Sequence, residues 1–391
     1  MSPWPAPGGG EGPLAGLKVL DLSRVLAGPF ATMLLGDLGA DVLKIESPSG
    51  DVTRHWGPPF VGDTAVYYFT TNRNKRSVVL DLTREQDRAA ALELAGEADV
   101  VVENFRPGGA ARFGLAYADV QARNPGCVYC SITGFGTGSA REDEPAYDLV
   151  VQAAGGMMGV TGVDGAPPVK VGVATADLLA GLYATTAIVA GLHERNRTGV
   201  GTDVEVSLMD TQVAGLANQA LNWLAARLNP SRLGSDHPNV APYGAYATGS
   251  SYIVVAVGND AQFAQLAAAL DRAAWVDDPR FATNRARVAN RAALRDELQS
   301  VLELRSADEW LARLRAARVP CAPVRDVAAV FADEEISERV VRHVPHPTLG
   351  EIPQVLSPFR FRGRPTEVRG APPALGQHTD EVLSSVMERT Q

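Results

Sequence analysis

The chain is organised around one stretch, Lys170-Val-Gly-Val-Ala-Thr-Ala-Asp177-Leu-Leu-Ala-Gly-Leu-Tyr-Ala-Thr-Thr-Ala-Ile-Val-Ala-Gly-Leu-His193-Glu-Arg-Asn-Arg-Thr-Gly199. Small residues recur in it at helical spacing, so it predicts a buried helix that lets neighbouring elements approach closely. The stretch ends with Arg195, Arg197 and Gly199. Arginines are favourable at the negative C-terminal end of a helix dipole, and a glycine commonly ends a helix.

Asp177 stands where this helix begins, and no other acidic side chain occurs between Asp164 and Glu194. One hypothesis makes Asp177 an N-cap whose carboxylate accepts backbone N–H groups. The other makes it a nucleophile that the helix N-terminus keeps ionised. The local sequence leaves both hypotheses open.

Composition limits the classes of function. The chain has 391 residues, 46% of them apolar, which predicts a globular protein of two domains or one elaborated domain. Its net charge of −9 argues against nucleic acid as a partner. We find no signal peptide and no apolar run long and charge-free enough to span a membrane. Three cysteines point to a reducing compartment, so we expect a cytoplasmic protein without a membrane partner.

Strands alternate with helices through the first part of the chain. Residues 1–12 are rich in Pro and Gly and predict a disordered tail. Residues 13–222 predict a large α/β domain with a Rossmann-like, doubly wound, mostly parallel sheet. The expected strands are Lys18–Ser23, Asp41–Glu46, Ser77–Leu82, Asp99–Glu103 and Cys127–Ile132, and the expected helices are Gly28–Leu38, Arg84–Ala98 and Tyr117–Asn124.

The pattern changes after residue 222. A polar loop, a hairpin and charged amphipathic helices predict a smaller α+β domain over residues 223–325. Residues 326–391 hold short pieces whose apolar side chains need a partner surface, and we expect them to return to the large domain. The helices expected in the smaller domain are Asp260–Leu270, Arg291–Leu304 and Ala307–Arg318.

Several common chemistries lack their motifs. The chain contains no G-x-G-x-x-G, no P-loop and no G-x-S-x-G. The six histidines show no metal-ligand spacing, so we expect no metal. Cys127 and Cys130 have redox spacing but fall on an expected strand, where positions three apart face opposite sides. What remains is a carboxylate without a metal or nicotinamide, which can perform covalent acyl transfer or proton shuttling.

Seven segments, in the same order, resemble those of the class III coenzyme A transferases, also called the CaiB/BaiF family. The resemblance covers about residues 14–385, and agreement of many motifs in order is more specific than any single motif. The segments are Val19–Thr32, Leu38–Glu46, Asn72–Ser77, Glu103–Gly108, Ser131–Gly136, Asp177–Gly181 and Leu375–Thr379.

The resemblance implies an enzyme in which Asp177 is the nucleophile. Asp177 would attack an acyl-CoA to form a mixed anhydride and would then take the CoA as an aspartyl thioester. The acceptor carboxylate would receive the CoA through a second anhydride. The substrates would be an acyl-CoA and a carboxylic acid, with no ATP, metal or tightly bound cofactor. The family also implies an interlocked homodimer in which each chain threads through the other.

The resemblance also implies a CoA site. The residues carried over are Leu26, Ala27, Leu80, Asp81, Leu82, Thr83, Asn104, Phe105, Arg106, Arg112, Thr133, Gly134, Phe135 and Gly136. The chain departs from the formyl-CoA transferase branch, which has an arginine at Ser47, a lysine at Thr133, a glutamine at Leu26 and a tetraglycine loop near Gly234–Asn239. Formyl or oxalate chemistry is therefore not expected.

Two alternatives are kept. The family's racemase branch inverts the centre next to an acyl-CoA carbonyl and needs a histidine where Tyr147 stands. Two-base proton transfer needs a group that titrates near neutrality, which tyrosine normally does not. A non-catalytic acyl-CoA-binding protein is the alternative of another class, and the intact surroundings of Asp177 argue against it.

Further segments suggest the substrates. Several segments look most like the succinyl-CoA:glutarate transferases of this family: Arg54–Gly62 before Tyr67-Tyr68, together with Pro242-Tyr243, Val257–Asn259 and Gln262-Phe263. A dicarboxylate carries a second carboxylate that needs a cationic or N–H-rich partner. Arg54, His55 and His237 are the uncommitted candidates for that partner, and Tyr147 is a further candidate substrate contact. We expect CoA transfer from succinyl-CoA or a similar acyl-CoA to a short dicarboxylate, glutarate first.

Overall fold

The computed structural model describes Trp4, residues 10–362 and residues 364–390, and the chain divides into two compact units. Unit 1 takes the chain up to residue 157, residues 171–217 and the part from residue 338 onward. Unit 2 takes residues 158–170 and 218–337. The domain limits given above stay predictions. Most of the predicted tail lies outside the described residues, but Trp4 is buried and its indole Nε1 donates to Asp41, which differs from a disordered tail.

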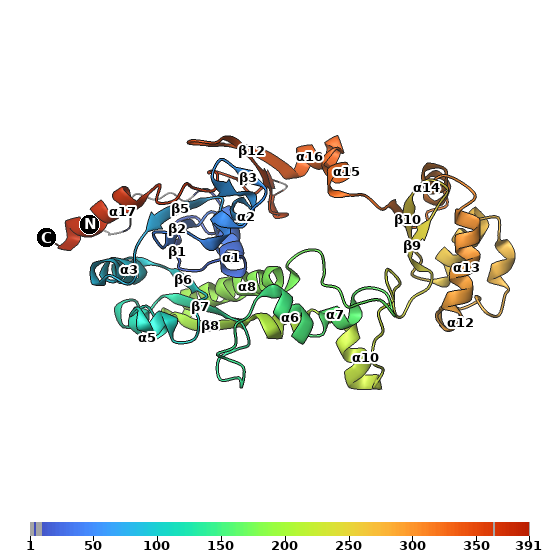
Figure 1. The fold of residues 1–391 in the computed structure, drawn as a ribbon, viewed down its shortest axis with the longest axis horizontal. Coiled ribbons are helices and arrows are strands. Elements are labelled where there is room, and N and C mark those ends of the chain that lie inside the picture. Colours follow the sequence, from blue (N-terminus) through green and yellow to red (C-terminus); the bar gives the residue numbers. More distant parts are fainter. Residues whose placement is uncertain (1–3, 5–9, 363, 391) are drawn as a thin grey trace. The chain divides into compact units, whose positions relative to one another are not determined.

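A six-stranded parallel sheet forms the centre of unit 1 (Figure 1). The strand order is β5-β2-β1-β6-β7-β8, and all neighbouring strands are parallel, so the predicted parallel α/β sheet is confirmed. The chain adds strands on one side of β1 first and then on the other, so the strand order reverses between β1 and β6. The strands are β1 Lys18–Asp21, β2 Asp41–Glu46, β5 Lys75–Val79, β6 Val100–Glu103, β7 Val128–Thr133 and β8 Thr202–Ser207. The edge strand β8 was not predicted: in its residues Thr-Asp-Val-Glu-Val-Ser, polar side chains alternate with valines, unlike the apolar run of β6.

Helices cover both faces of this sheet. Leu20 and Tyr129 belong to one core cluster, with α3 Glu85–Glu97, α5 Tyr117–Arg123 and α17 Thr379–Thr390. Val19 and Val128 belong to the other, with α1 Ala27–Asp37 and α8 Thr175–Thr198. Neighbouring strand residues thus alternate between the two faces. Cys127 lies in the first cluster and Cys130 in the second, which confirms that their side chains face opposite sides.

Helix α8 is the long helix expected from the opening stretch. A Cβ added at Gly181 would lie 2.7 Å from the Ala27 carbonyl oxygen of α1, and one added at Gly191 would lie 2.9 Å from Thr202 Cγ2. Gly199 ends the helix with a φ of 75°, as its position predicted. Among the described helices, α8 alone is long and apolar enough to cross a membrane, so the expectation that no run reaches that length is wrong. Its packing on α1, β7 and β8 explains this composition.

Unit 1 also contains shorter helices and strands outside the six-stranded sheet. They are η1 Val52–His55, β3 Phe60–Val61, β4 Thr64–Ala65, α2 Val66–Phe69, α4 Gly109–Arg112, α6 Asp148–Ala154, α9 Leu208–Ala214, β12 Val341–His346, β13 Gly350–Val355, β14 Arg360–Phe361 and β15 Arg364–Pro365. The start of α17 and the residue before it cover the sheet edge: His378 Nδ1 accepts the Ser77 N–H, and Thr379 Oγ1 accepts the Val79 N–H. This contact shields strand β5 from unwanted strand pairing.

Unit 2 holds a three-stranded antiparallel sheet of order β11-β10-β9, packed against α11, α13 and α14. Trp310 and Phe263 lie in its core, and the buried Arg287 donates to the carbonyl oxygens of Ala241 and Phe281. The elements are β9 Tyr243–Ala247, β10 Tyr252–Ala256, β11 Cys321–Pro323, α10 Asn218–Ala226, α11 Asp260–Ala269, η2 Ala273–Val276, α12 Asn284–Ala289, α13 Arg291–Leu302, α14 Ala307–Ala316 and α15 Val327–Phe331. Helices α7 Met157–Val160 and α16 Glu334–Val340 cross the unit limits.

Candidate active site

The carboxyl ends of β1 and β6 meet where the strand order reverses, which is the usual position of a ligand site in an open α/β sheet. Two hydrogen bonds join the loops that follow these strands. The Arg24 N–H donates to Asn104 Oδ1, and Asn104 Nδ2 donates to the Arg24 carbonyl oxygen, both at 2.8 Å. The Asn104 side chain therefore fixes the two loops at the reversal point.

A cavity of about 420 Å³ opens at these strand ends, within unit 1. Its wall includes Leu26 and Ala27 at the start of α1, Thr133 and Gly134 at the end of β7, and Asp177 in the first turn of α8. The cavity thus joins the predicted nucleophile to residues from two other chain segments.

A second cavity, of about 380 Å³, adjoins the first. The two share Arg24, Phe105 and Arg106 in their walls. The second is lined by residues 80–83 after β5 and by Arg112. Together the cavities form one continuous site along the carboxyl edge of the sheet.

Asp177 is the third residue of α8 and does not cap it. The N-cap position belongs to Ala174, which makes no side-chain cap bond. Asp148, the first residue of α6, takes the capping role, because its Oδ1 accepts the Ala176 N–H at 2.8 Å. Asp148 Oδ2 in turn accepts from Gln152 Nε2 at 2.6 Å. The cap interpretation of Asp177 is therefore wrong, and among the described residues no hydrogen bond engages its carboxylate.

Burial and then the charge of Asp148 raise the pKa of Asp177 from 3.8 to about 7. Burial therefore opposes the ionisation that a helix N-terminus would favour, and an ionised Asp177 stays a prediction. A pKa near neutrality leaves both protonation states populated at physiological pH. Such a group can act as a nucleophile when ionised and is less strongly solvated than a surface carboxylate.

Comparisons with known proteins identify the family of the chain. The model of the CoA-transferase family III matches residues 14–379. The chain belongs to this family. It is 41% identical over 377 residues to the succinyl-CoA:glutarate CoA-transferase of Homo sapiens, covering 96% of this chain and 86% of that protein. It is 40% identical over 388 residues to the succinate–glutarate CoA-transferase of Agrobacterium fabrum (strain C58 / ATCC 33970), covering 97% of each.

A solved structure is also similar. A CaiB/BaiF family protein from Brucella suis superposes with a TM-score of 0.85 at 42% identity, covering 96% of this chain and 100% of that one. The protein is therefore an enzyme of the class III CoA-transferases, and the family predicted from the sequence motifs is confirmed.

Most of the transferase's expected CoA residues lie in the walls of the two cavities. Those in the walls are Leu26, Ala27, Leu80, Asp81, Leu82, Thr83, Asn104, Phe105, Arg106, Arg112, Thr133, Gly134 and Gly136. Phe135 is the exception, since its side chain is buried and the Arg141 guanidinium covers its ring at 3.9 Å. Phe135 supports the loop after β7 and does not line either cavity.

The residues predicted to contact the substrate, including those for a second carboxylate, lie in different places. Arg54 is not uncommitted, which corrects the prediction: its buried guanidinium donates twice to Glu46 and once to Tyr68 Oη. His55 is exposed, with Nε2 3.3 Å from the Ser49 carbonyl oxygen, and it lines neither cavity. His237 lies in unit 2, where its Nδ1 accepts the Asn239 N–H. Tyr147 lines the first cavity.

Two aromatic residues beside Tyr147, namely Trp56 and Tyr67, were not predicted as site residues from the sequence. The Trp56 ring centroid lies 5.4 Å from that of Tyr67 and 6.4 Å from that of Tyr147. Burial and then the charge of Asp177 raise the pKa of Tyr67 to about 12, so its hydroxyl stays protonated. The pair Tyr67-Tyr68 is visible in the sequence, but only the fold brings Tyr67 toward Asp177.

Metal and cysteine chemistry find no support. In the described part of the chain, no group of three or more His, Cys, Asp or Glu side chains is placed to hold a metal ion. The three cysteines are unpaired, and burial raises the pKa of the Cys127 and Cys130 thiols to about 12, which makes them poor nucleophiles.

Proposed function

We propose that this transferase moves CoA from succinyl-CoA, or a similar acyl-CoA, to a short dicarboxylic acid, glutarate first. One observation carries the proposal: Asp177 shares a cavity with the residues expected to bind CoA, at the reversal point of the sheet. Relatives that match nearly the whole chain carry the names of succinyl-CoA:glutarate transferases. The long motif agreement noted from the sequence supports the same substrates.

The proposed reaction passes through Asp177 in four steps. The ionised carboxylate attacks the thioester carbonyl, and the C–S bond breaks to give a mixed anhydride and CoA thiolate. The thiolate attacks the aspartyl carbonyl, releasing the donor acid and leaving an aspartyl-CoA thioester. The acceptor carboxylate displaces the thiolate to form a second anhydride. The thiolate then attacks the acceptor acyl carbonyl, which gives the new acyl-CoA and returns the Asp177 carboxylate.

The surroundings of Asp177 suit this chemistry. Its carboxylate is not tied up in a cap, because Asp148 performs that role. Gly181, one turn further along α8, lets that helix approach the Ala27 carbonyl closely, so Asp177 lies near the first turn of α1. Backbone N–H groups in the first turn of a helix have no intrahelical acceptor and can stabilise a developing oxyanion. Partial burial also limits the access of water, which would hydrolyse either anhydride.

We assign the CoA moiety to the two adjoining cavities. Arg106 lines both cavities and Arg112 lines the second, and both side chains are exposed enough to pair with phosphate groups. Residues 80–83 form the wall that follows β5. Ser47, which lines the second cavity, replaces the arginine of the formyl-CoA transferase branch, so the adenine end would lack that cation.

The second carboxylate of a dicarboxylate needs a different partner from Arg54. Arg24 is exposed, lines both cavities and has its backbone fixed by Asn104. We therefore place Arg24 ahead of His55 and His237 as the cation for that carboxylate. Trp56, Tyr67 and Tyr147 would enclose the carbon chain between the two carboxylates.

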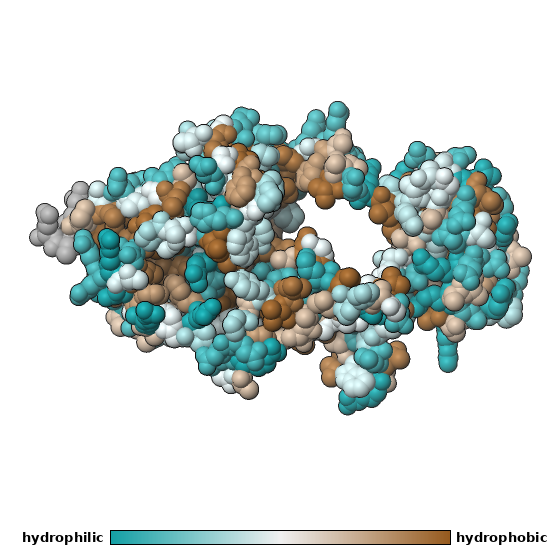
Figure 2. Space-filling view, in the orientation of Figure 1, coloured by the Kyte–Doolittle hydropathy of each residue, from teal (hydrophilic) through white to brown (hydrophobic). Residues whose placement is uncertain are grey.

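We further propose an interlocked homodimer. Leu182, Tyr183 and Val189 on α8 are 40–49% exposed, which is unusual for apolar residues on a central helix. Leu149 and Val150 on α6 are exposed by 52% and 41%, and Figure 2 shows apolar residues gathered over this helix. A second copy of the chain would cover these surfaces. The cytoplasmic location remains a prediction from the cysteine content.

An acceptor panel tests the proposal. Succinyl-CoA is incubated with the enzyme and single acids of increasing chain length, together with aryl, carnitine-like and bile acids, and each new CoA thioester is identified by mass spectrometry. We expect glutaryl-CoA to form fastest. If only the non-dicarboxylic acids accept CoA, the dicarboxylate proposal is wrong although the enzyme class stands.

A further inference from the structure

Val25 has a backbone conformation that its side chain disfavours. Its φ is +72°, in the left-handed region that β-branched residues rarely adopt. The residue lies in the loop between β1 and α1, at the reversal point of the sheet, and it lines the cavity that contains Asp177. Something in the surrounding structure must hold the loop in this state.

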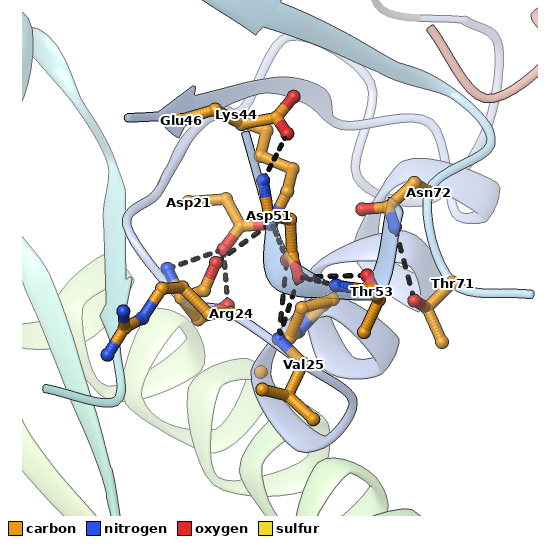
Figure 3. A network of polar contacts seen from close by, with 12 residues as sticks. Asp21, Arg24, Val25, Lys44, Glu46, Asp51, Thr53, Thr71 and Asn72 are labelled. Carbon is orange, nitrogen blue, oxygen red and sulfur yellow. Dashed lines mark hydrogen bonds and ion pairs between the residues drawn. The ribbon is translucent and has the colours of Figure 1, made fainter. Parts of the chain in front are cut away.

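The Asp51 carboxylate makes the contact that holds it (Figure 3). Asp51 Oδ2 accepts the Val25 N–H at 3.2 Å, and Oδ1 lies 3.4 Å from the same nitrogen. The adjacent Arg24 N–H is bound separately by Asn104. The backbone N–H groups on both sides of the turn are thus fixed by side chains from other segments.

Asp51 is itself held rigidly. The residue is 2% exposed, and Lys44 Nζ lies 3.0 Å from Oδ2 in an ion pair without solvent access. The Thr53 N–H and hydroxyl donate to Oδ1 at 3.0 and 2.8 Å. The Asp51 N–H donates to Glu46 Oε2 at 2.9 Å. Although burial opposes ionisation, Lys44 and Thr53 hold the pKa of Asp51 below its usual value, so it binds Val25 as a carboxylate.

The turn at Val25 sets the start of α1. Leu26 is the N-cap of α1, and Ala27 is its first residue. The Ala27 carbonyl oxygen is the atom that a Cβ at Gly181 would contact at 2.7 Å, and Asp177 lies one turn before Gly181 on α8. A change at Val25 would therefore move the first turn of α1 relative to Asp177.

We propose that Asp51 is a positioning residue for the transfer reaction: it holds Val25 in the left-handed conformation and thereby fixes the start of α1 beside Asp177. The inference rests on the proposed function for its effect on turnover. The contact between Asp51 and Val25 can be tested without that function.

A double-mutant cycle tests it, with wild type, Asp51→Asn, Val25→Gly and the double variant. Transfer from succinyl-CoA to glutarate and unfolding in urea are measured for all four. Asp51→Asn should lower kcat about 10–100-fold and change the KM for succinyl-CoA less, since displacement by about 1 Å can cost that much. Val25→Gly adopts the positive φ without a side-chain penalty, so its own kcat serves as the reference for the double variant.

Rescue decides the outcome. If Asp51 acts through Val25, the double variant should return to within about threefold of Val25→Gly. A double variant as slow as Asp51→Asn would overturn the inference, as would wild-type kcat in Asp51→Asn. Thr53→Ala is the matched control: it loosens the turn after Asp51 and leaves the Val25 contact, so Val25→Gly should not rescue it.

Two further outcomes are covered. If Asp51→Asn fails to fold because Lys44 loses its ion-pair partner, folding in the Val25→Gly background supports the inference, and failure in both backgrounds overturns it. If the wild type does not transfer CoA from succinyl-CoA to glutarate but the unfolding free energies of the four proteins show coupling between Asp51 and Val25, the proposed function is wrong and the contact is supported. If the wild type is active but neither kcat nor the unfolding free energy shows coupling between the two positions, the inference is overturned and the proposed function stands.

Discussion

The Asp148 carboxylate accepts the backbone N–H of Ala176 at 2.8 Å, directly before Asp177. One acidic residue therefore caps helix α8 and leaves the next one free to face the cavity. The same neighbour raises the pKa of Asp177, after burial itself. Asp148 is thus both a structural and an electrostatic partner of the proposed nucleophile.

Removing the charge of Asp148 should change how activity depends on pH. Asp148→Asn keeps an oxygen for the Ala176 N–H but loses the negative charge, so the pKa of Asp177 should fall. The rising limb of kcat/KM should then shift to lower pH, as measured by initial rates from pH 5 to 9. Asp148→Ala is the control, since it also removes the cap and should lower stability by about 1 kcal/mol. An unshifted limb in the asparagine variant would contradict the charge effect.

The wild-type enzyme should gain activity as pH rises through about 7, the pKa of Asp177, because only the ionised carboxylate attacks. Stability should follow the opposite course. The folded-state pKa lies above the unfolded value of 3.8, so the folded state binds more protons between about pH 4 and 7 and loses stability as pH rises through 7. Urea unfolding at several pH values should show Asp177→Asn gaining stability relative to wild type above pH 7. Equal pH dependence of the two proteins would contradict the raised pKa.

The close contact between α8 and α1 should be sensitive to one methyl group. In Gly181→Ala the new Cβ would lie 2.7 Å from the Ala27 carbonyl oxygen, a backbone atom that cannot move aside alone. We expect a loss of about 1–3 kcal/mol in unfolding free energy, together with reduced turnover. Gly370→Ala is a matched control, since its Cβ would meet nothing within 4 Å. Equal stabilities of the two variants would argue against close packing at Gly181.

The proposed dimer can be checked by sedimentation. The exposed apolar residues of α6 and α8 lead us to expect a dimer at micromolar concentration that separates only on unfolding. Analytical ultracentrifugation over a range of concentrations measures this. A folded, active monomer would rule out the interlocked arrangement.

The sequence predicted what depends on local pattern. The strands and helices of the parallel sheet, the small residues of α8 and the stop at Gly199 follow from periodicity and glycine positions. The position of Asp177 at a helix start also followed from the pattern. Its freedom from capping did not, because the cap comes from Asp148, 28 residues earlier in the chain.

Other features depend on contacts that a sequence does not display. Arg54 looked available for a substrate, yet strand β2 brings Glu46 against it inside the core. A valine gives no signal for a positive φ, so the turn at Val25 was invisible before Asp51 was placed beside it. Most residues expected to bind CoA line the two cavities, because they belong to loops at the same edge of the sheet, whereas the side chain of Phe135 is buried beneath Arg141; their binding of CoA stays a prediction.

Direct detection of CoA bound covalently to Asp177 is the most decisive measurement. The wild type and Asp177→Ala are incubated with succinyl-CoA, quenched in acid, digested and analysed by mass spectrometry, with hydroxylamine trapping in parallel. We predict a CoA adduct, or the corresponding hydroxamate, on the wild-type peptide that contains Asp177. The adduct should disappear as glutarate is added and glutaryl-CoA appears, and Asp177→Ala should be slower by about 10⁴-fold or more. Turnover with no adduct at Asp177, or with an active alanine variant, would contradict the account.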